Sequence, residues 1–176
     1  MNVLLVGNGG REHAIAWKLA KSAKIDKLFI APGNPGTAKH GINIDIKANE
    51  YDKLLKFAID NKVGLAVIGP EDPLADGIVD KFEKAGIKAF GPSGAAAQLE
   101  ADKAFAKQIM KANSVPTAES RIFDKFADAK AYIASRDEAV VIKAAGLAKG
   151  KGVFVCDEPS DGINAAEKIG EFWILK

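Results

Sequence analysis

Short apolar runs alternate with amphipathic stretches through the first half of the chain, and this alternation limits the possible folds more than any other feature. The apolar runs cover residues 3–6, 27–31, 63–68 and 87–90. The stretches between them, such as residues 50–61 and 73–86, carry apolar residues at helical spacing and predict one helix each. Unbroken apolar strands joined by helices are typical of a parallel sheet with helices on both faces. We therefore predict an open, parallel, doubly wound α/β domain from residue 1 to about residue 92.

The pattern changes after about residue 93. Residues 93–115 are rich in alanine and predict one long helix or two, with Phe105, Ile109 and Ala112 on the inner face. An extended segment, a helix at 126–135 and two strands at 138–143 and 152–156 follow. The two strands are joined by a glycine-rich loop, so we expect a hairpin there.

Composition excludes several classes of protein. The chain has 176 residues, of which 48% are hydrophobic and 27% charged, and its formal net charge is +2. This charge is too small to favour nucleic acid or an acidic membrane surface as a partner. No apolar run approaches the length of about 18 residues that a membrane span needs, and the start of the chain lacks the features of a signal peptide. The single cysteine, Cys156, excludes an intrachain disulfide. We expect a cytoplasmic protein.

The first glycine-rich loop, "VGNGGREH" at residues 6–13, joins the first strand to the first helix. Such loops bind anions because backbone N–H groups and the positive end of the helix point at the ligand. Gly7 and Gly9 fit the dinucleotide pattern, but Glu12 stands at its third glycine and no acid closes the second strand. NAD binding is therefore disfavoured. Two interpretations stay open, a tight turn without a ligand and a phosphate site that uses Arg11.

Two further polar loops are expected at the same edge of the sheet. Residues 32–37 follow the second strand and residues 69–74 follow the third. The loops beyond the carboxyl ends of parallel strands form the binding crevice of open sheets. Glu71 either meets a hydroxyl or amine of a ligand or serves as an acid at the start of a helix.

The second glycine-rich loop, "KAAGLAKGKG" at residues 143–152, does not fit the P-loop of ATPases. Gly146 and Gly150 are separated by three residues, and Gly152 stands where a Ser or Thr binds magnesium in that pattern. A strand follows the loop, which favours a flap that closes over a polyphosphate. The alternative is a solvated hairpin. Lys143, at the end of an apolar strand, is a candidate phosphate donor, whereas Lys103 is by itself an ordinary helical lysine.

Six motifs in this order resemble one family, that of phosphoribosylamine–glycine ligase (glycinamide ribonucleotide synthetase) in the ATP-grasp superfamily. The motifs are "VLLVGNGGREHAIAWKLA", "APGNPGT", "VIGPEDPLADGIVD", "FGPSGAAAQLEADKAFAK", "VPTAE" and "VIKAAGLAKGKGV". They cover the chain to about residue 155. The resemblance implies a substrate-binding domain over residues 1–100 and an incomplete ATP-grasp region over residues 101–176, with a flap at 143–153. The chain departs from the pattern of this family at two positions of the flap. Ala145 stands where the family usually has an aspartate, and Lys149 stands where it usually has a small or apolar residue.

The resemblance implies a role for fourteen residues. Those expected by the phosphoribosylamine are Gly9, Gly10, Arg11, Glu12, Asn34, Gly36, Thr37 and Glu71. Those expected by ATP are Lys103, Lys143, Gly146, Gly150, Lys151 and Gly152. The ligands of Mg²⁺ (or Mn²⁺) are expected beyond Lys176, so no residue is assigned to the metal.

The implied reaction belongs to purine biosynthesis. ATP phosphorylates glycine, and the amine of 5-phosphoribosylamine attacks the glycyl phosphate. Because the metal ligands are expected elsewhere, we expect no ligase activity from the 176-residue chain alone. The alternative function is a non-catalytic module that binds a nucleotide or phosphosugar and is completed by a partner chain.

Overall fold

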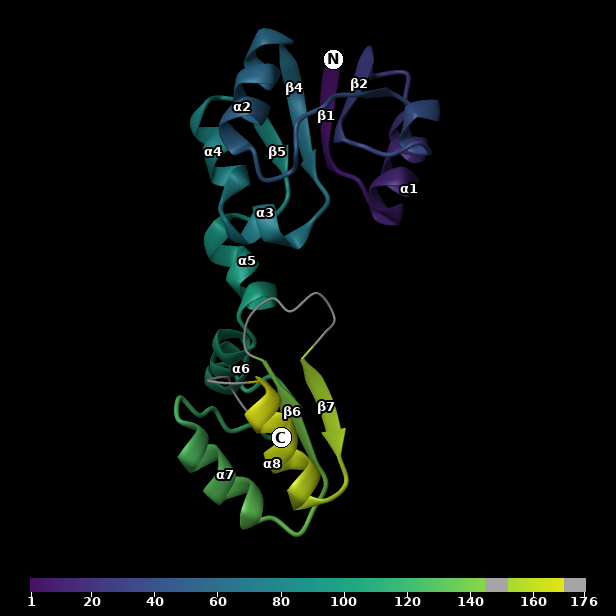
Figure 1. Cartoon of the computed structure of the whole chain (residues 1–176). Coiled ribbons are helices and arrows are strands. Elements are labelled where there is room, and N and C mark those ends of the chain that lie inside the picture. The colour runs from purple at the N-terminus through teal and green to yellow at the C-terminus, as the bar shows by residue number, and fades with distance from the viewer. Residues whose placement is uncertain (145–151, 170–176) are drawn as a thin grey trace. The chain divides into compact units, whose positions relative to one another are not determined.

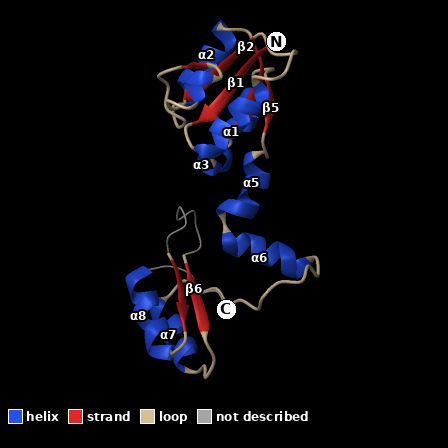
Figure 2. Cartoon of the chain, turned by 90° about the vertical axis from the view of Figure 1, so that its right-hand side faces the viewer, coloured by secondary structure: helices blue, strands red, loops and turns tan. Residues whose placement is uncertain are grey.

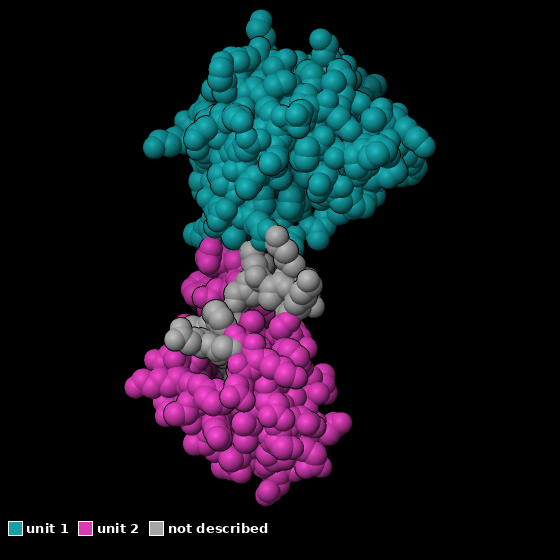
Figure 3. All heavy atoms as spheres, in the orientation of Figure 1, with its two compact units in different colours: residues 1–97 teal, residues 98–176 magenta. Residues whose placement is uncertain are grey.

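The computed structural model describes residues 1–144 and 152–169. The chain divides into two compact units, residues 1–97 and residues 98–176 (Figure 3). Each unit is built around its own sheet.

The first unit contains a five-stranded sheet in which every strand pairs in parallel with its neighbours. The strands are β1 (Asn2–Gly7), β2 (Lys27–Pro32), β3 (Ile42–Asn43), β4 (Val63–Ile68) and β5 (Lys88–Phe90). Their order in the sheet is β3-β2-β1-β4-β5. The predicted open parallel sheet is therefore confirmed. Strand β3 was not predicted, since its two residues form no apolar run and pair only with β2.

Helices cover both faces of this sheet (Figures 1 and 2). They are α1 (Gly10–Leu19), α2 (Tyr51–Asp60), α3 (Glu71–Ala75) and α4 (Ile78–Lys84), with a short 3-10 helix, η1, at Thr37–Lys39. Leu4 and Val6 share one core with α2 and α4, whereas Val3 and Leu5 share another with α1. Alternate residues of β1 thus enter opposite cores, which explains the unbroken apolar run. The doubly wound prediction is confirmed.

One predicted helix is divided in two. The apolar spacing of residues 73–86 predicts a continuous helix, but α3 ends at Ala75 and α4 begins at Ile78. Gly77 lies between them with a φ of 79°, a left-handed conformation that breaks the helix. Ile78, Val79 and Phe82 are buried as the spacing indicates.

The second unit contains a two-stranded antiparallel hairpin and the helices around it. Helix α5 (Gly94–Ala101) leads into it, followed by α6 (Lys103–Ala112), α7 (Phe126–Ala134), β6 (Val140–Lys143), β7 (Val153–Cys156) and α8 (Pro159–Ile169). Helices α7 and α8 pack on one face of the hairpin through Ile133, Ile142 and Ala166 (Figure 2). The predicted hairpin is confirmed as an antiparallel pair.

The long alanine-rich stretch forms two helices, one of the two possibilities that the sequence left open. Asp102 has an extended conformation and accepts hydrogen bonds from the backbone N–H groups of Ala104 and Phe105. This cap begins α6 directly after α5. The predicted inner face was wrong, because Phe105 and Ile109 are 36% and 39% exposed while Ala104 and Ala106 are buried.

Candidate functional site

The strand order defines where a ligand site is expected in the first unit. The chain leaves β1 toward β2 and β3, and then returns to the other side of β1 to form β4 and β5. In open parallel sheets, ligands bind beyond the carboxyl ends of the strands at this reversal. The loops after β1, β2 and β4 all lie at that edge. Backbone bonds join them directly, from Gly33 N to Gly7 O (3.1 Å) and from Gly69 N to Val6 O (3.0 Å).

Glu12 lies beneath these loops. Its side chain is buried, at 5% exposure, and its Oε2 accepts a hydrogen bond from Gly9 N at 2.6 Å. A Cβ at Gly69 would overlap the Glu12 carboxyl group, and a Cβ at Gly7 would lie 2.5 Å from Glu12 Cγ. Glu12 therefore fills space left by two glycines on different loops. Glu12 therefore holds the loops after β1 and β4 in place, whereas the neighbouring Arg11 is exposed to solvent.

Arg11 connects α1 to the loop after β4. Its Nη1 donates a hydrogen bond to Gly69 O at 2.7 Å and lies 3.6 Å from Glu71 Oε2. The Arg11 side chain is 63% exposed and that of Glu71 is 36% exposed. Glu71 is the first residue of α3, where an acid also suits the helix dipole. The position of Glu71 is thus compatible with contact to a ligand and with a role as the acid at the start of α3. Together, Arg11 and Glu71 present a guanidinium and a carboxylate to solvent at the point where the strand order reverses.

Asn34 holds the loop after β2 against the loop after β1. Its Nδ2 donates to Asn8 O at 2.9 Å, and its Oδ1 accepts from Gly36 N at 2.7 Å and Thr37 N at 3.0 Å. Thr37 is fully buried, and its hydroxyl donates to Asn34 O at 2.8 Å. Asn34 and Thr37 therefore shape the loop from within. Gly9, Gly10 and Gly36 lie on the loops that these contacts join.

The residues expected by ATP lie in the second unit. Lys103 is the first residue of α6, and Lys143 is the last residue of β6, where it is half-buried. Ala144 N donates to Gly152 O at 2.9 Å and closes the hairpin end, where Gly152 has a φ of 71°. Gly146, Gly150 and Lys151, with Ala145 and Lys149, lie outside the described residues. The pairing of β6 with β7 and the bond between Ala144 and Gly152 therefore bring Lys143 and Gly152 to the same end of the hairpin.

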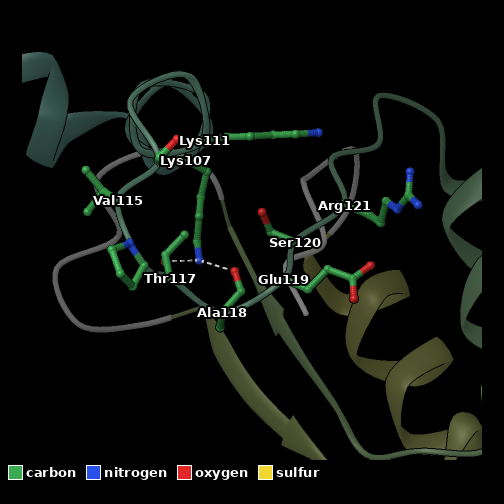
Figure 4. A pocket seen from close by; sticks show the side chains of 10 residues that line it. Lys107, Lys111, Val115, Thr117, Ala118, Glu119, Ser120 and Arg121 are labelled. Carbon is green, nitrogen blue, oxygen red and sulfur yellow. Dashed lines mark hydrogen bonds between the residues drawn. The ribbon is translucent and has the colours of Figure 1, made fainter.

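A pocket of about 420 Å³ in the second unit was not anticipated from the sequence (Figure 4). It lies between the end of α6 and residues 114–121. Lys107 Nζ donates to Thr117 Oγ1 and to Ala118 O, both at 2.7 Å, and so fastens this extended segment to the helix. The motif "VPTAE" (residues 115–119) forms part of its lining, but the motif alone did not predict a pocket, because the pocket depends on the path of a segment without regular structure.

Neither a metal cluster nor a membrane helix is found in the described part of the chain. Across residues 1–144 and 152–169, no group of three or more His, Cys, Asp or Glu side chains is arranged to hold a metal ion. No helix within these ranges combines the length and apolar character needed to cross a bilayer.

The fold and the family models define the class of protein. Residues 101–172 match the model of the ATP-grasp (A) domain of phosphoribosylglycinamide synthetase, which places the chain in the ATP-grasp class. Residues 1–100 match the model of the N domain of the same enzyme. The chain belongs to the phosphoribosylglycinamide synthetase family, whose members are also called phosphoribosylamine–glycine ligases. The match extends to residue 172, further than the six motifs reach.

Individual relatives agree with this family. The phosphoribosylamine–glycine ligase of Halalkalibacterium halodurans is 46% identical over 169 residues, which cover 96% of this chain and 40% of the relative. That of Haemophilus influenzae is 51% identical over 157 residues, covering 88% and 37%. The crystal structure of the Thermotoga maritima ligase superposes with a TM-score of 0.75 at 32% identity, covering 93% of this chain and 38% of that one. The chain thus spans about 40% of the length of the curated relatives it matches.

Proposed function

We propose that the chain forms the N-terminal part of an ATP-dependent ligase that joins glycine to 5-phosphoribosylamine. In this reaction the γ-phosphoryl group of ATP passes to the glycine carboxylate and ADP is released. The amine nitrogen of phosphoribosylamine then attacks the acyl carbon, phosphate leaves, and the nitrogen loses a proton. An amide bond results. Family membership supports this proposal, and the linked loops of the first unit are the observation that carries it.

The three loops suit a phosphorylated sugar amine. Glu71 presents a carboxylate that can accept a hydrogen bond from an amine, and Arg11 holds a positive charge 3.6 Å from it. Gly9 and Gly10 bring backbone close to the ligand at the start of α1, where a helix favours anions. The hydrogen bonds of Asn34, Thr37 and Glu12 hold the loops after β1 and β2 in place. We assign phosphoribosylamine to this edge of the sheet.

We assign ATP to the second unit. Lys103 and Lys143 would contact its phosphates, and Gly146, Gly150, Lys151 and Gly152 would form the covering flap. A lysine is a compact charge suited to phosphate oxygens, and a closing flap excludes water from the transferring group. Magnesium screens that group in related chemistry. No residue within 1–144 or 152–169 is assigned to the metal.

A pair of measurements tests the proposal. Calorimetry of the 176-residue chain should show saturable binding of ribose 5-phosphate, and a coupled ADP-release assay should show no turnover with glycine and phosphoribosylamine. The Haemophilus influenzae ligase is the positive control for turnover. Turnover by this chain alone would overturn the expected inactivity. Absence of ribose 5-phosphate binding at millimolar concentration would overturn the assignment of the substrate site.

The same experiment separates the ligase from a non-catalytic binding module. A polypeptide made from the part of the Haemophilus influenzae ligase that this chain does not match is added in excess. The ligase interpretation predicts that ADP release appears with both chains and with neither one alone. Binding without turnover in the mixture would favour the module.

A further inference from the structure

His13 is a polar residue of the site edge to which the sequence motifs assigned no role. It follows Glu12 in the first turn of α1 and is partly exposed. Arg11 reaches toward the loop after β4, whereas the His13 ring lies against the loop after β2. The two side chains thus flank the start of α1 on the sides of two different loops.

The contact between His13 and Gly36 is close. A Cβ at Gly36 would lie 2.6 Å from Cε1 and 2.7 Å from Nδ1 of the His13 ring. The absence of a side chain at Gly36 therefore makes room for the imidazole. The ring of His40, which follows η1, lies on the same side with its centroid 5.3 Å from that of His13 and tilted by 32°. The ring of His13 is thus located by packing against the loop.

Within residues 1–144 and 152–169, the His13 imidazole makes a ring contact with His40 but no hydrogen bond. An imidazole that is fixed in place can donate from one ring nitrogen and accept at the other. Beside it, Gly10, His13, Ala14 and Trp17 line a shallow hollow of about 360 Å³. The imidazole is therefore a free donor at the rim of an open space next to the first glycine loop.

The charges on the two sides of α1 differ. On the β4 side, the Arg11 guanidinium already donates to Gly69 O and lies beside the Glu71 carboxylate. On that side the Glu71 carboxylate offsets the Arg11 charge, so a dianionic phosphate gains little net attraction there. On the β2 side, the loop residues 33–37 carry no charged side chain. The amine end of a phosphosugar amine suits the first side, and its phosphate end suits the second.

We propose that His13 is a further substrate-binding residue, which donates an imidazole N–H hydrogen bond to the phosphate of the phosphoribosylamine. This inference rests on the proposed function, because it places the same substrate within the same site. The substrate then crosses the start of α1, with its amine toward Glu71 and its phosphate toward His13 and Gly36.

The test uses the imidazole signals in the NMR spectrum of the full chain. The sequence contains two histidines, His13 and His40, so the His13→Asn and His40→Asn variants assign the signals directly. Ribose 5-phosphate, ribose and inorganic phosphate are titrated separately. We expect a saturable shift of the His13 signals with ribose 5-phosphate and none with ribose. Inorganic phosphate is expected to shift them only at much higher concentration.

Affinity provides the second readout. His13→Asn should weaken ribose 5-phosphate binding about tenfold or more, as expected for a lost hydrogen bond to a charged group. Lys18→Ala, which changes an exposed lysine near the end of the same helix, is the control and should stay within about twofold of the unaltered chain. If the unaltered chain binds ribose 5-phosphate but neither the His13 signals nor the His13→Asn affinity change, the inference is overturned and the proposed function stands. If the unaltered chain does not bind, both are overturned.

Discussion

The buried carboxyl group of Glu12 occupies the place that a side chain at Gly69 would need. This contact joins the first turn of α1 to the loop after β4, and it predicts a strong effect of Gly69→Ala. The added methyl group would displace Glu12 and its hydrogen bond to Gly9. We expect a loss of about 2 kcal/mol in the free energy of unfolding, typical of an overpacked site. Urea denaturation followed by circular dichroism measures it.

Gly64→Ala is the matched control for this prediction. Gly64 lies within β4, and a Cβ there would lie 3.5 Å from Met1 Cβ, an ordinary contact distance. The control should change the stability by less than about 0.5 kcal/mol. Equal stability of the two variants would contradict the space-filling role of Glu12.

Asn34 is predicted to stabilise the loop after β2 through both ends of its amide. Asn34→Ala removes the bonds to Asn8, Gly36 and Thr37 and should cost about 2 kcal/mol. Asn34→Asp keeps the acceptor oxygen and should cost about half as much. Hydrogen exchange of the Gly36 and Thr37 amides should accelerate most in the alanine variant. Exchange as slow as in the unaltered chain would show that these bonds do not hold the loop.

Lys107 is predicted to restrain the extended segment that follows α6. Lys107→Met keeps most of the side-chain stem but removes the hydrogen bonds to Thr117 and Ala118 (Figure 4). Trypsin should then cleave after Arg121 several-fold faster, because proteolysis follows local opening. Lys111→Met, on the same helix, is the control and should leave that rate unchanged. The prediction fails if the two variants are cleaved alike.

The thiol of Cys156 is predicted to be unreactive in the folded chain. Its side chain is buried, and burial raises its pKa above the ordinary value, with smaller effects from the charges of Asp161 and Asp157. Because the thiolate is the reactive form, alkylation by iodoacetamide at pH 8 should be at least about tenfold slower than in urea. Equal rates in the two conditions would contradict the burial.

The same raised pKa gives a pH dependence of stability. Protons leave the Cys156 thiol in the unfolded chain at a lower pH than in the folded chain. Its contribution is therefore fully present below the ordinary thiol pKa and is lost as the pH rises toward the folded value. A Cys156→Ala variant should lack this part of the alkaline loss of stability. An identical alkaline profile in both chains would exclude it.

The sheet of the first unit was predictable because its strands are buried on both faces. Residues 3–6 contribute alternately to two cores, so all of them are apolar and the run is unmistakable. Strand β3 has no such run, since only its pairing with β2 makes it a strand. The break at Gly77 and the exposure of Phe105 depend on tertiary context, which local spacing does not contain.

The position of the candidate site was predictable, and its internal contacts were not. Glycines and polar residues after three strands indicate one edge of a parallel sheet. The sequence does not reveal that Glu12 turns inward under Gly69 or that Asn34 joins two loops, because these contacts link residues far apart in the chain. His13 was overlooked for the same reason, since its significance depends on the missing side chain at Gly36.

Calorimetric titration with ribose 5-phosphate tests most directly the claim that these loops form a phosphosugar site. The chain is compared with Arg11→Ala and with Lys18→Ala, an exposed lysine near the end of the same helix. We predict saturable binding that Arg11→Ala weakens at least about tenfold, because the Glu71 charge is then left unpaired near the ligand. Lys18→Ala should bind as the unaltered chain does. No binding at millimolar concentration, or equal affinity of all three chains, would contradict the claim.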